Sequence, residues 1–280
     1  MNFIPYLFLF TIAIVPLWAE AQSGKKSAEQ TKEPVFNVYM ARYEDGDGST
    51  IFNEDLKAVA PVSSQPFVII TGVKFKDCAN GFPTHAEFDR LYVISDSVRA
   101  IIDPRGDNSL AGTFTYQCER LDYYYASDTV NLRHQLLNLY ARSFSNYESY
   151  VNIKVDKDWD AYLRFLYPNE TIREYMRNEQ VIRNLTESGD KLDKARRVDH
   201  WIYFLREEDR QQFEAYATKL GFSIGEKANN KDDQERPLGL RIHRIDKVDL
   251  DTISKLTLEL RQKASAHNGD YDGWETEVVK

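Results

Sequence analysis

The sequence predicts an α/β (α+β) protein of two tandem ferredoxin-like sandwiches, in which antiparallel sheets carry helices on one face. One observation is the length of 280 residues, which suffices for two domains that each bury a core. The other is the order of expected elements, strand-helix-strand-strand-helix-strand, which occurs once in each half of the chain. A hydrophobic content of 42% with 29% charged residues excludes a disordered chain, a collagen-like chain and a polytopic membrane protein.

In the first half, alternating apolar residues predict strands, and apolar residues three or four apart predict helices. The expected strands are 36–40, 67–75, 110–116, 121–125 and 150–155. The expected helices run from Thr84 to Ile102, over 130–144 and over 159–167, where Pro168 ends the last one.

The second half repeats this plan after a polar helix over 170–186. The expected strands are 200–205, 222–224, 238–248 and 274–279, and 228–237 is expected to be a polar turn. The expected helices are 208–220, which ends at Gly221, and one that begins at Asp251 or Thr252. In the latter helix, Leu256 and Leu260 are expected to face the core.

The N-terminus predicts export. Residues 3–18 are apolar except for Thr11, and Ala19-Glu20-Ala21 has the small-residue pattern that signal peptidase cuts. We therefore expect a signal peptide at 1–21, cleavage after Ala21, and a periplasmic or secreted protein that no longer touches the membrane. A cytoplasmic location stays open because Met1-Asn2 carries no Lys or Arg.

The expected domain plan follows from these elements. After the signal peptide comes a flexible polar leader at 22–34, then a first domain at 35–168. A connecting helix and linker at 169–194 leads to a second domain at 195–280.

Two cysteines, Cys78 and Cys118, are candidates for a disulfide in an exported chain, although each is equally explained as a small buried apolar side chain. No P-loop, dinucleotide-binding glycine motif, nucleophile elbow or zinc-protease motif occurs. Residues 43–54 approximate a calcium loop, but Tyr43 stands where that loop requires Asp, so a solvated turn is the better interpretation. We expect no cofactor, no metal and no catalytic residue.

Short sequence motifs in each half of the chain resemble motifs of known protein families. In the second half these are Gly189-Asp190, 197–204 (RVDHWIYF), 220–222 (LGF) and 269–275 (GDYDGWE). With these residues the chain over about 175–280 resembles the regulator of ribonuclease E activity B family. The first half, in 80–83 (NGFP), 112–115, 123–125, 159–162 and 166–168, resembles the domain of unknown function 695 family.

The resemblance implies a non-enzymatic protein that acts by binding a protein partner, and in the regulator family that partner is ribonuclease E. Direct nucleic-acid binding is not expected, because 36 basic against 44 acidic residues give a net charge of −8. Three hypotheses follow: an exported protein-binding module of unknown partner, a cytoplasmic inhibitor of ribonuclease E, and an enzyme or small-ligand binder that uses a cleft between the domains. The oligomeric state is left open.

The candidate partner-binding residues are Asp199 and His200 on the first strand of the second domain, with Tyr271, Asp272, Gly273 and Trp274. Asp272-Gly273 is a turn dipeptide, and aromatic side chains are common anchors of interfaces. The alternative is that Trp274 only fixes the final strand to the core, in which case it should be nearly inaccessible.

The export hypothesis predicts that the mature protein begins at Gln22. Intact mass and N-terminal sequencing of the protein from its source measure this directly. A full-length chain in the cytosolic fraction would contradict export and favour the cytoplasmic hypothesis.

Overall fold

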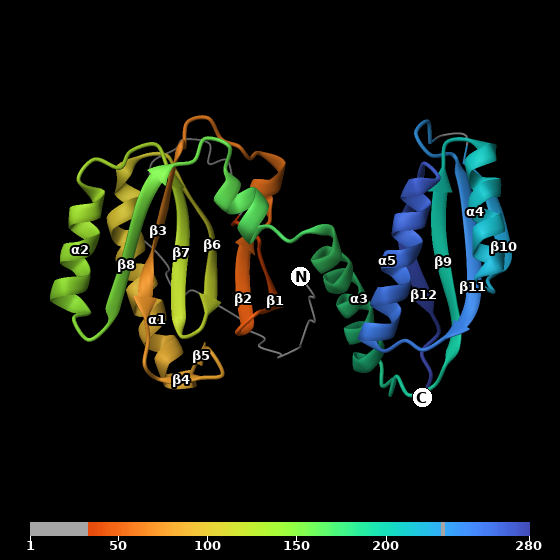
Figure 1. Ribbon diagram of the computed structural model, residues 1–280, viewed down its shortest axis with the longest axis horizontal. Coiled ribbons are helices and arrows are strands. Elements are labelled where there is room, and N and C mark those ends of the chain that lie inside the picture. The colour runs from red at the N-terminus through yellow and green to blue at the C-terminus, as the bar shows by residue number, and fades with distance from the viewer. Residues whose placement is uncertain (1–32, 231–232) are drawn as a thin grey trace, which may run out of the picture. The chain divides into compact units, whose positions relative to one another are not determined.

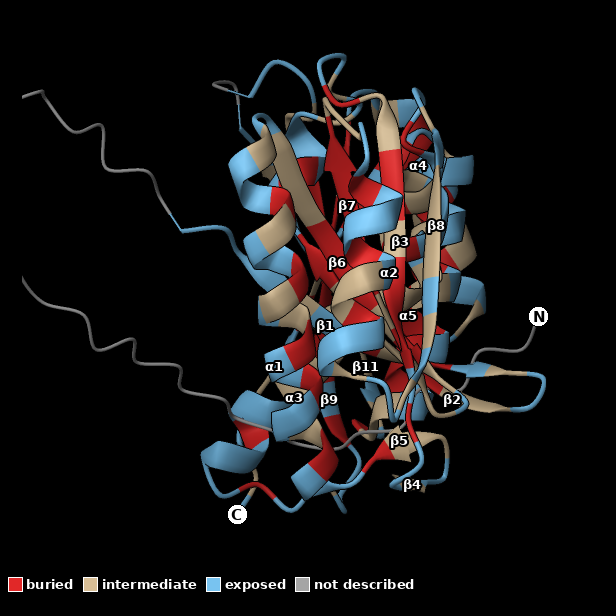
Figure 2. Cartoon of the chain, turned by 90° about the vertical axis from the view of Figure 1, so that its left-hand side faces the viewer, coloured by how far each residue is buried: buried red, intermediate tan, exposed pale blue. Residues whose placement is uncertain are grey.

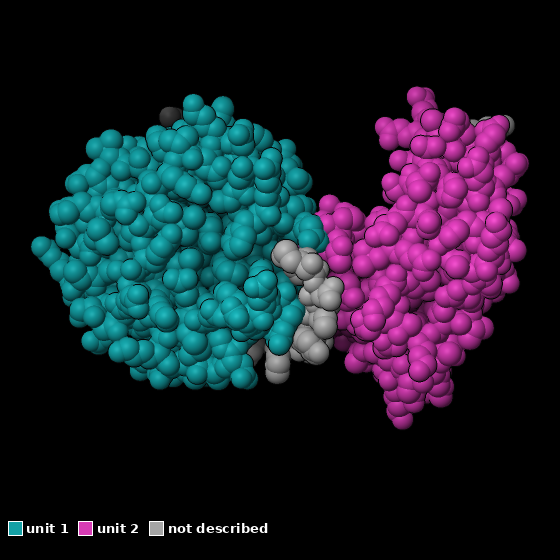
Figure 3. Space-filling model, viewed as in Figure 1, with its two compact units in different colours: residues 1–169 teal, residues 170–280 magenta. Residues whose placement is uncertain are grey.

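The computed structural model describes residues 33–230 and 233–280, which divide into two compact units at Asn169–Glu170 (Figure 3). We call them the N-terminal unit and the C-terminal unit. The expected signal peptide at 1–21 and residues 22–32 of the expected leader lie outside the described residues. Figure 2 shows the buried residues concentrated on strands and the exposed ones on the outer sides of helices.

The N-terminal unit contains a six-stranded antiparallel sheet with the order β1-β2-β6-β7-β3-β8 (Figure 1). Its strands are β1 (Phe36–Tyr43), β2 (Gly46–Asn53), β3 (Phe67–Lys74), β6 (Asn108–Tyr116), β7 (Glu119–Ala126) and β8 (Glu148–Val155). Two short strands, β4 (Cys78–Ala79) and β5 (Phe82–Pro83), pair with each other. Strands β3, β6, β7 and β8 with two helices give the expected ferredoxin-like order, and the β1–β2 hairpin extends this sheet beyond β6.

Helices α1 (His85–Ile102) and α2 (Leu132–Ser143) bury their apolar sides on one face of this sheet. Leu91, Ile94 and Val98 of α1 meet Ile69 of β3 there, as the helical spacing predicts. Short 3₁₀ turns lie at Asp55–Ala58 and Asp103–Arg105.

The other face of the same sheet is covered by the chain after β8. Trp159 stacks on Tyr125 with ring centroids 3.9 Å apart, and its Nε1–H donates to the carbonyl of Gln65. The Tyr162 hydroxyl donates to the carbonyl of Asn53 at 2.6 Å. The helix expected over 159–167 is a single π-helical turn, Ala161–Leu166, and the contacts of Trp159 and Tyr162 hold this segment against the strands.

Strand β2 was not expected from the sequence. The residues that approximate a calcium loop form the β1–β2 hairpin, whose two-residue turn is Glu44-Asp45. Glycine and polar residues hide the strand pattern in Gly46–Asn53, and cross-strand pairing overrides the low strand propensity of these residues.

The C-terminal unit contains a four-stranded antiparallel sheet with the order β10-β11-β9-β12. Its strands are β9 (Arg196–Phe204), β10 (Ser223–Asn229), β11 (Leu238–Asp246) and β12 (Gly269–Thr276). Helices α4 (Glu207–Lys219) and α5 (Leu250–Ala266) cover one face and complete the ferredoxin-like order. The mixed α/β class with antiparallel sheets is therefore confirmed in both units.

Several boundaries in this unit differ from expectation, and β9 begins at Arg196 rather than at His200. Helix α5 is capped by Asp249, whose carboxylate accepts from the N–H of Thr252, so the helix begins before Asp251. Strand β10 extends through Asn229, into the segment expected as a turn. The final strand is 269–276 rather than 274–279, because Gly269 and Tyr271 pair with Phe204 and Ile202 of β9.

Helix α3 (Glu170–Glu187) belongs to the C-terminal unit, although 169–194 was expected to be a connection. Asn178 of α3 donates to the hydroxyls of Ser254 and Thr257 on α5 and accepts from Nε1 of Trp274. The helix is thus bonded to α5 and to β12, and it joins the helical layer of this unit.

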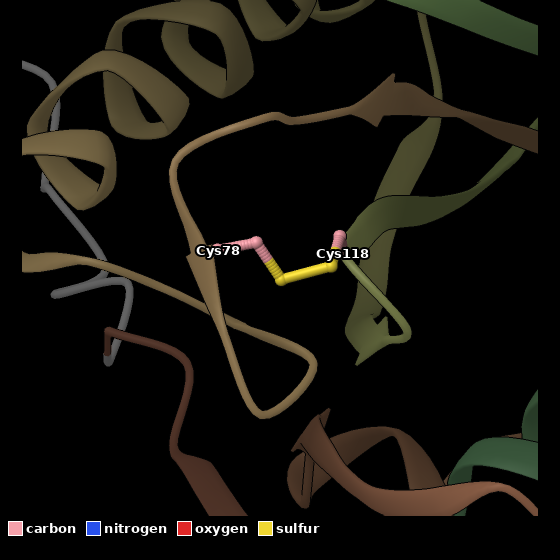
Figure 4. The surroundings of a disulfide bond; sticks show 2 residues. All are labelled: Cys78 and Cys118. Atoms are coloured by element: carbon pink, nitrogen blue, oxygen red, sulfur yellow. A yellow bond between two sulfur atoms is a disulfide. The ribbon is translucent and has the colours of Figure 1, made fainter.

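A disulfide joins Cys78 to Cys118, with their Cα atoms 5.7 Å apart (Figure 4). Cys118 lies in the two-residue turn of the β6–β7 hairpin, where Gln117 and Cys118 both have positive φ. The Cys118 N–H donates to the carbonyl of Gly81, and its carbonyl accepts from the N–H of Phe75. The disulfide therefore ties the β4–β5 loop to this turn.

Within 33–230 and 233–280, no helix combines the length and the apolar composition that crossing a bilayer requires.

Leu260 is fully buried among the core side chains of the C-terminal unit. Replacing Leu260 by Ala should lower the free energy of unfolding by about 2–5 kcal/mol, because it leaves a cavity. The exposed Leu205 is the control, and Leu205→Ala should change this quantity by less than about 0.5 kcal/mol. Urea denaturation followed by circular dichroism measures both, and equal effects of the two variants would contradict the assignment of Leu260 to the core.

Candidate functional site

The C-terminal sheet has one face that the described helices of its unit leave uncovered. Side chains alternate along β9, so Val198, Ile202 and Phe204 enter the core beneath α4 and α5 while their neighbours point the other way. We call this second surface the open face. Its residues are Arg197, Asp199, Trp201 and Tyr203 of β9, Arg241, His243 and Ile245 of β11, Glu226 of β10, and Asp272 and Glu275 of β12.

A stacked pair lies in the middle of the open face. Trp201 and Arg241 are directly opposite each other in the β9–β11 pairing, and the guanidinium lies 5.3 Å from the centre of the indole ring. Both side chains are partly exposed, that of Arg241 to 31%. Their cation–π contact holds two groups that commonly anchor protein interfaces in fixed orientations.

Asp199 lies next to this pair and is held by two arginines. Arg197 donates to both of its carboxylate oxygens at 2.8 Å, and Nε of Arg241 is 3.7 Å from one of them. The hydrogen bonds from Arg197, and to a smaller extent the charges of Arg241 and His243, lower the pKa of Asp199 despite its burial. The carboxylate is thus ionised throughout the neutral range.

The β12 side of the open face is acidic. Glu275 is opposite Asp199 in the sheet, and Asp272 lies near enough to Tyr203 to raise the pKa of its hydroxyl, adding to the larger effect of burial. With Glu226 on the opposite side, carboxylates outnumber the guanidiniums of Arg197 and Arg241. The open face therefore has an aromatic centre and a net negative charge.

A β-bulge shapes β12. The pairing register with β9 shifts between Tyr271 and Gly273, so Asp272 is an extra residue in the strand. Without it, Tyr271 and Trp274 would point to opposite faces, since side chains alternate with a period of two. The bulge brings both rings into the core and leaves Asp272 and Gly273 on the open side.

Three of the six residues proposed from the sequence are therefore not surface residues. His200, Tyr271 and Trp274 are nine-tenths or more buried because they lie on the helix-covered side of β9 and β12. Nδ1 of His200 and the Tyr271 hydroxyl form a hydrogen bond of 2.8 Å. These side chains support the sheet from within and are not available as contact residues.

The other three candidates, Asp199, Asp272 and Gly273, do lie together on the open face. However, Asp272-Gly273 is the bulge of a strand rather than a turn, and Gly273 has no positive φ. The sequence analysis missed Trp201, Tyr203 and Arg241. Period-two alternation within 197–204 could have found the first two, because it places Arg197, Asp199, Trp201 and Tyr203 on one side of the strand.

No group of three or more His, Cys, Asp or Glu side chains in the described part of the chain is arranged to hold a metal ion. His267 Nδ1 lies 3.3 Å from Oε1 of Gln212, and Asp270 lies at the sheet edge, 4.0 Å from Arg261.

The two units match two known families. Residues 176–276 match the family model described as Regulator of ribonuclease activity B, and residues 36–167 match the Family of unknown function (DUF695). Both resemblances inferred from the motifs are thereby confirmed. The family matched by the C-terminal unit is described as regulatory, and the family matched by the N-terminal unit is of unknown function. The first spans all four strands of the C-terminal sheet and most of α3.

The likeness to other known proteins is slight. No curated protein matches the chain. A crystal structure of a proposed glycine cleavage system transcriptional repressor is 13% identical with a TM-score of 0.22, covering 75% of this chain and 98% of its own. A crystal structure of an unknown protein from Galdieria sulphuraria is 10% identical with a TM-score of 0.21, covering 76% and 99%. These TM-scores are too low to indicate a shared fold.

The buried His200 predicts a pH dependence of stability. Burial, and next the charge of Arg244, lowers the pKa of His200 from 6.5 to about 3, so the folded chain keeps this ring neutral where the unfolded chain protonates it. The free energy of unfolding should therefore fall as the pH is lowered below 6.5, by about 2 kcal/mol at about pH 5.

The matched variant is His200→Gln, whose amide does not titrate. Urea denaturation at several pH values should show a flatter dependence between about pH 6.5 and about pH 5 in this variant. Parallel curves for the two proteins would show that His200 is not the group responsible.

Proposed function

We propose that the protein is an exported, non-enzymatic regulator that binds a protein partner through the open face of the C-terminal sheet. The observation that carries this proposal is the Trp201–Arg241 pair at the centre of a sheet face that the described helices of its unit leave uncovered. Tryptophan, tyrosine and arginine contribute most of the binding free energy at many interfaces, since they bury a large area with few rotors to fix.

The charges of the open face indicate the kind of partner. Asp272, Glu275 and Glu226 surround the aromatic centre, while Asp199 is already paired with Arg197 and Arg241. A basic protein surface would complement this distribution and be steered toward it during association. The match to a regulator of ribonuclease activity supports a regulatory role of this unit.

Two features support the proposed export. One is the apolar segment at 3–18 followed by Ala19-Glu20-Ala21. The other is the Cys78–Cys118 disulfide, since such bonds persist mainly in oxidising compartments such as the periplasm and the extracellular space.

The alternative partner is ribonuclease E in the cytoplasm, and the specific observation in its favour is the family match over 176–276. The purified chain can be added to ribonuclease E during cleavage of an RNA substrate. The export proposal expects unchanged cleavage. Inhibition by the wild-type chain that is lost in Trp201→Ala would instead support the alternative. No observation on the described residues supports the third hypothesis, an enzyme or a small-ligand binder.

The partner is first identified by crosslinking. A photoreactive benzoylphenylalanine in place of Tyr203 can crosslink the partner in the source cells, and the same residue in place of the exposed Leu137 is the control. The open face is then tested with Trp201 and Trp274, two tryptophans of one sheet whose side chains point to opposite faces. With the partner so identified, Trp201→Ala should weaken its affinity roughly tenfold or more. The free energy of unfolding should fall less than in Trp274→Ala, because the ring of Trp201 is partly exposed.

Trp274→Ala is the matched variant. It should lower the free energy of unfolding by about 3–5 kcal/mol, because its ring fills the core and its Nε1–H binds Asn178. Calorimetric titration and urea denaturation of both variants separate the two roles. Full affinity in Trp201→Ala would refute the open face as the binding surface.

A further inference from the structure

The free edge of β1 in the N-terminal unit differs from the other three sheet edges. Strands β10 and β12 each contain a register shift, which twists an edge away from further pairing. At the β8 edge, Arg133 of α2 donates to the carbonyl of Val151, and Lys154 adds a charge. Strand β1 has no register shift, since its pairing with β2 is unbroken over eight residues. Its one charged residue, Arg42, lies beside the hairpin turn and is paired with Asp47, and residues 36–41 carry no charge.

The backbone of β1 is available for pairing. The carbonyl of Val35 accepts from the N–H of Glu54, so the backbone groups of every second residue from Val35 point toward β2. Those of Phe36, Val38 and Met40 therefore point outward, to the edge. Among residues 33–230 and 233–280 no hydrogen bond to this outward row is found, and such a row is a template for another extended strand.

The side chains of the same three residues form an exposed apolar row. Phe36 is 37% and Val38 is 58% exposed, and Met40 is partly exposed. They lie on the opposite side of β1 from Tyr39, whose hydroxyl binds the carbonyl of Leu166. Apolar side chains beside unpaired backbone groups mark an association surface rather than an ordinary solvated edge.

We propose that β1 pairs with β1 of a second copy of this chain. The three residues at 36, 38 and 40 are apolar and symmetric about Val38, and Arg42 continues the row only on the side of the turn. In an antiparallel pair around a two-fold axis at Val38, the two Val38 residues are opposite each other, and each Phe36 is opposite Met40 of the other copy. The outward backbone groups then meet in register, and the two six-stranded sheets become one continuous sheet.

This symmetry is the reason to choose a second copy rather than an unrelated peptide. Self-pairing sets apolar against apolar at 36, 38 and 40, and cross-strand pairs of this type stabilise antiparallel sheets. A contact limited to one strand from each copy is small, so the dimer should form in proportion to protein concentration.

The test compares valines on the two edges of one sheet. Val38 on β1 and Val155 on β8 are exposed to 58% and 59%. Sedimentation velocity of the full chain should show a dimer that grows with concentration, that is lost in Val38→Lys and that is kept in Val155→Lys. Val38→Lys sets two ammonium groups against each other at the axis. A monomer at every concentration, or equal loss of the dimer in both variants, would overturn the proposal.

A second pair of variants tests for the formation of a covalent dimer instead of the loss of a dimer. Opposite residues in such a pair have Cα atoms about 5.5 Å apart, within the range of a disulfide. Both natural cysteines are bonded to each other, so mild oxidation with diamide should link Val38→Cys into a covalent dimer and leave Val155→Cys monomeric. Protection of the Val38 amide from hydrogen exchange in a monomer would reveal another occupant of this edge, and would likewise overturn the proposal.

Discussion

The side chain of Asn178 organises the C-terminal unit. Its amide group donates to two hydroxyls of α5, and its oxygen accepts from the indole of Trp274 on β12. All three hydrogen bonds are buried, and a buried amide with unmade hydrogen bonds would be costly. The position of α3 is therefore fixed by a polar group whose two N–H donors are both used and whose oxygen accepts from Trp274. Because all three described helices of this unit lie in one layer, none of them covers the opposite face of its sheet.

In each strand of this sheet, about half of the side chains point into the core and the other half point to the open face. On β9, His200 and Ile202 support the sheet from within, while Asp199 and Trp201 face outward. A substitution on either side of the strand therefore has a distinct effect, on stability or on recognition. The bulge at Asp272 shows how strictly the core side is maintained. One inserted residue is tolerated because it keeps both flanking aromatic rings buried.

The sequence pattern was sufficient for the fold class and for most elements, because periods of two and 3.6 follow directly from backbone geometry. It failed at β2, whose glycines conceal a strand that exists only through pairing with β1 and β6. It also failed for α3, where a polar helix resembled a linker although Asn178 is a core residue.

The candidate site was found in the right strands but partly on the wrong face. The most distinctive residues of 269–275 are aromatic, and Tyr271 and Trp274 were candidates for surface anchors, with burial in the core as the alternative for Trp274. The structure has both in the core. A bulge cannot be recognised from alternation, since it breaks the very period on which that inference depends. Trp201 was available to period-two reasoning, but Arg241 became its partner only through the β9–β11 register, which the sequence does not contain.

The disulfide divides the molecule chemically as well as structurally. It closes a loop of 40 residues that contains α1 and β6, and loop closure of this length removes about 4 kcal/mol of conformational entropy from the unfolded chain. Both cysteines belong to the N-terminal unit, and the C-terminal unit contains none. A reducing environment would therefore remove this stabilisation from the N-terminal unit, while the C-terminal unit has no disulfide to lose.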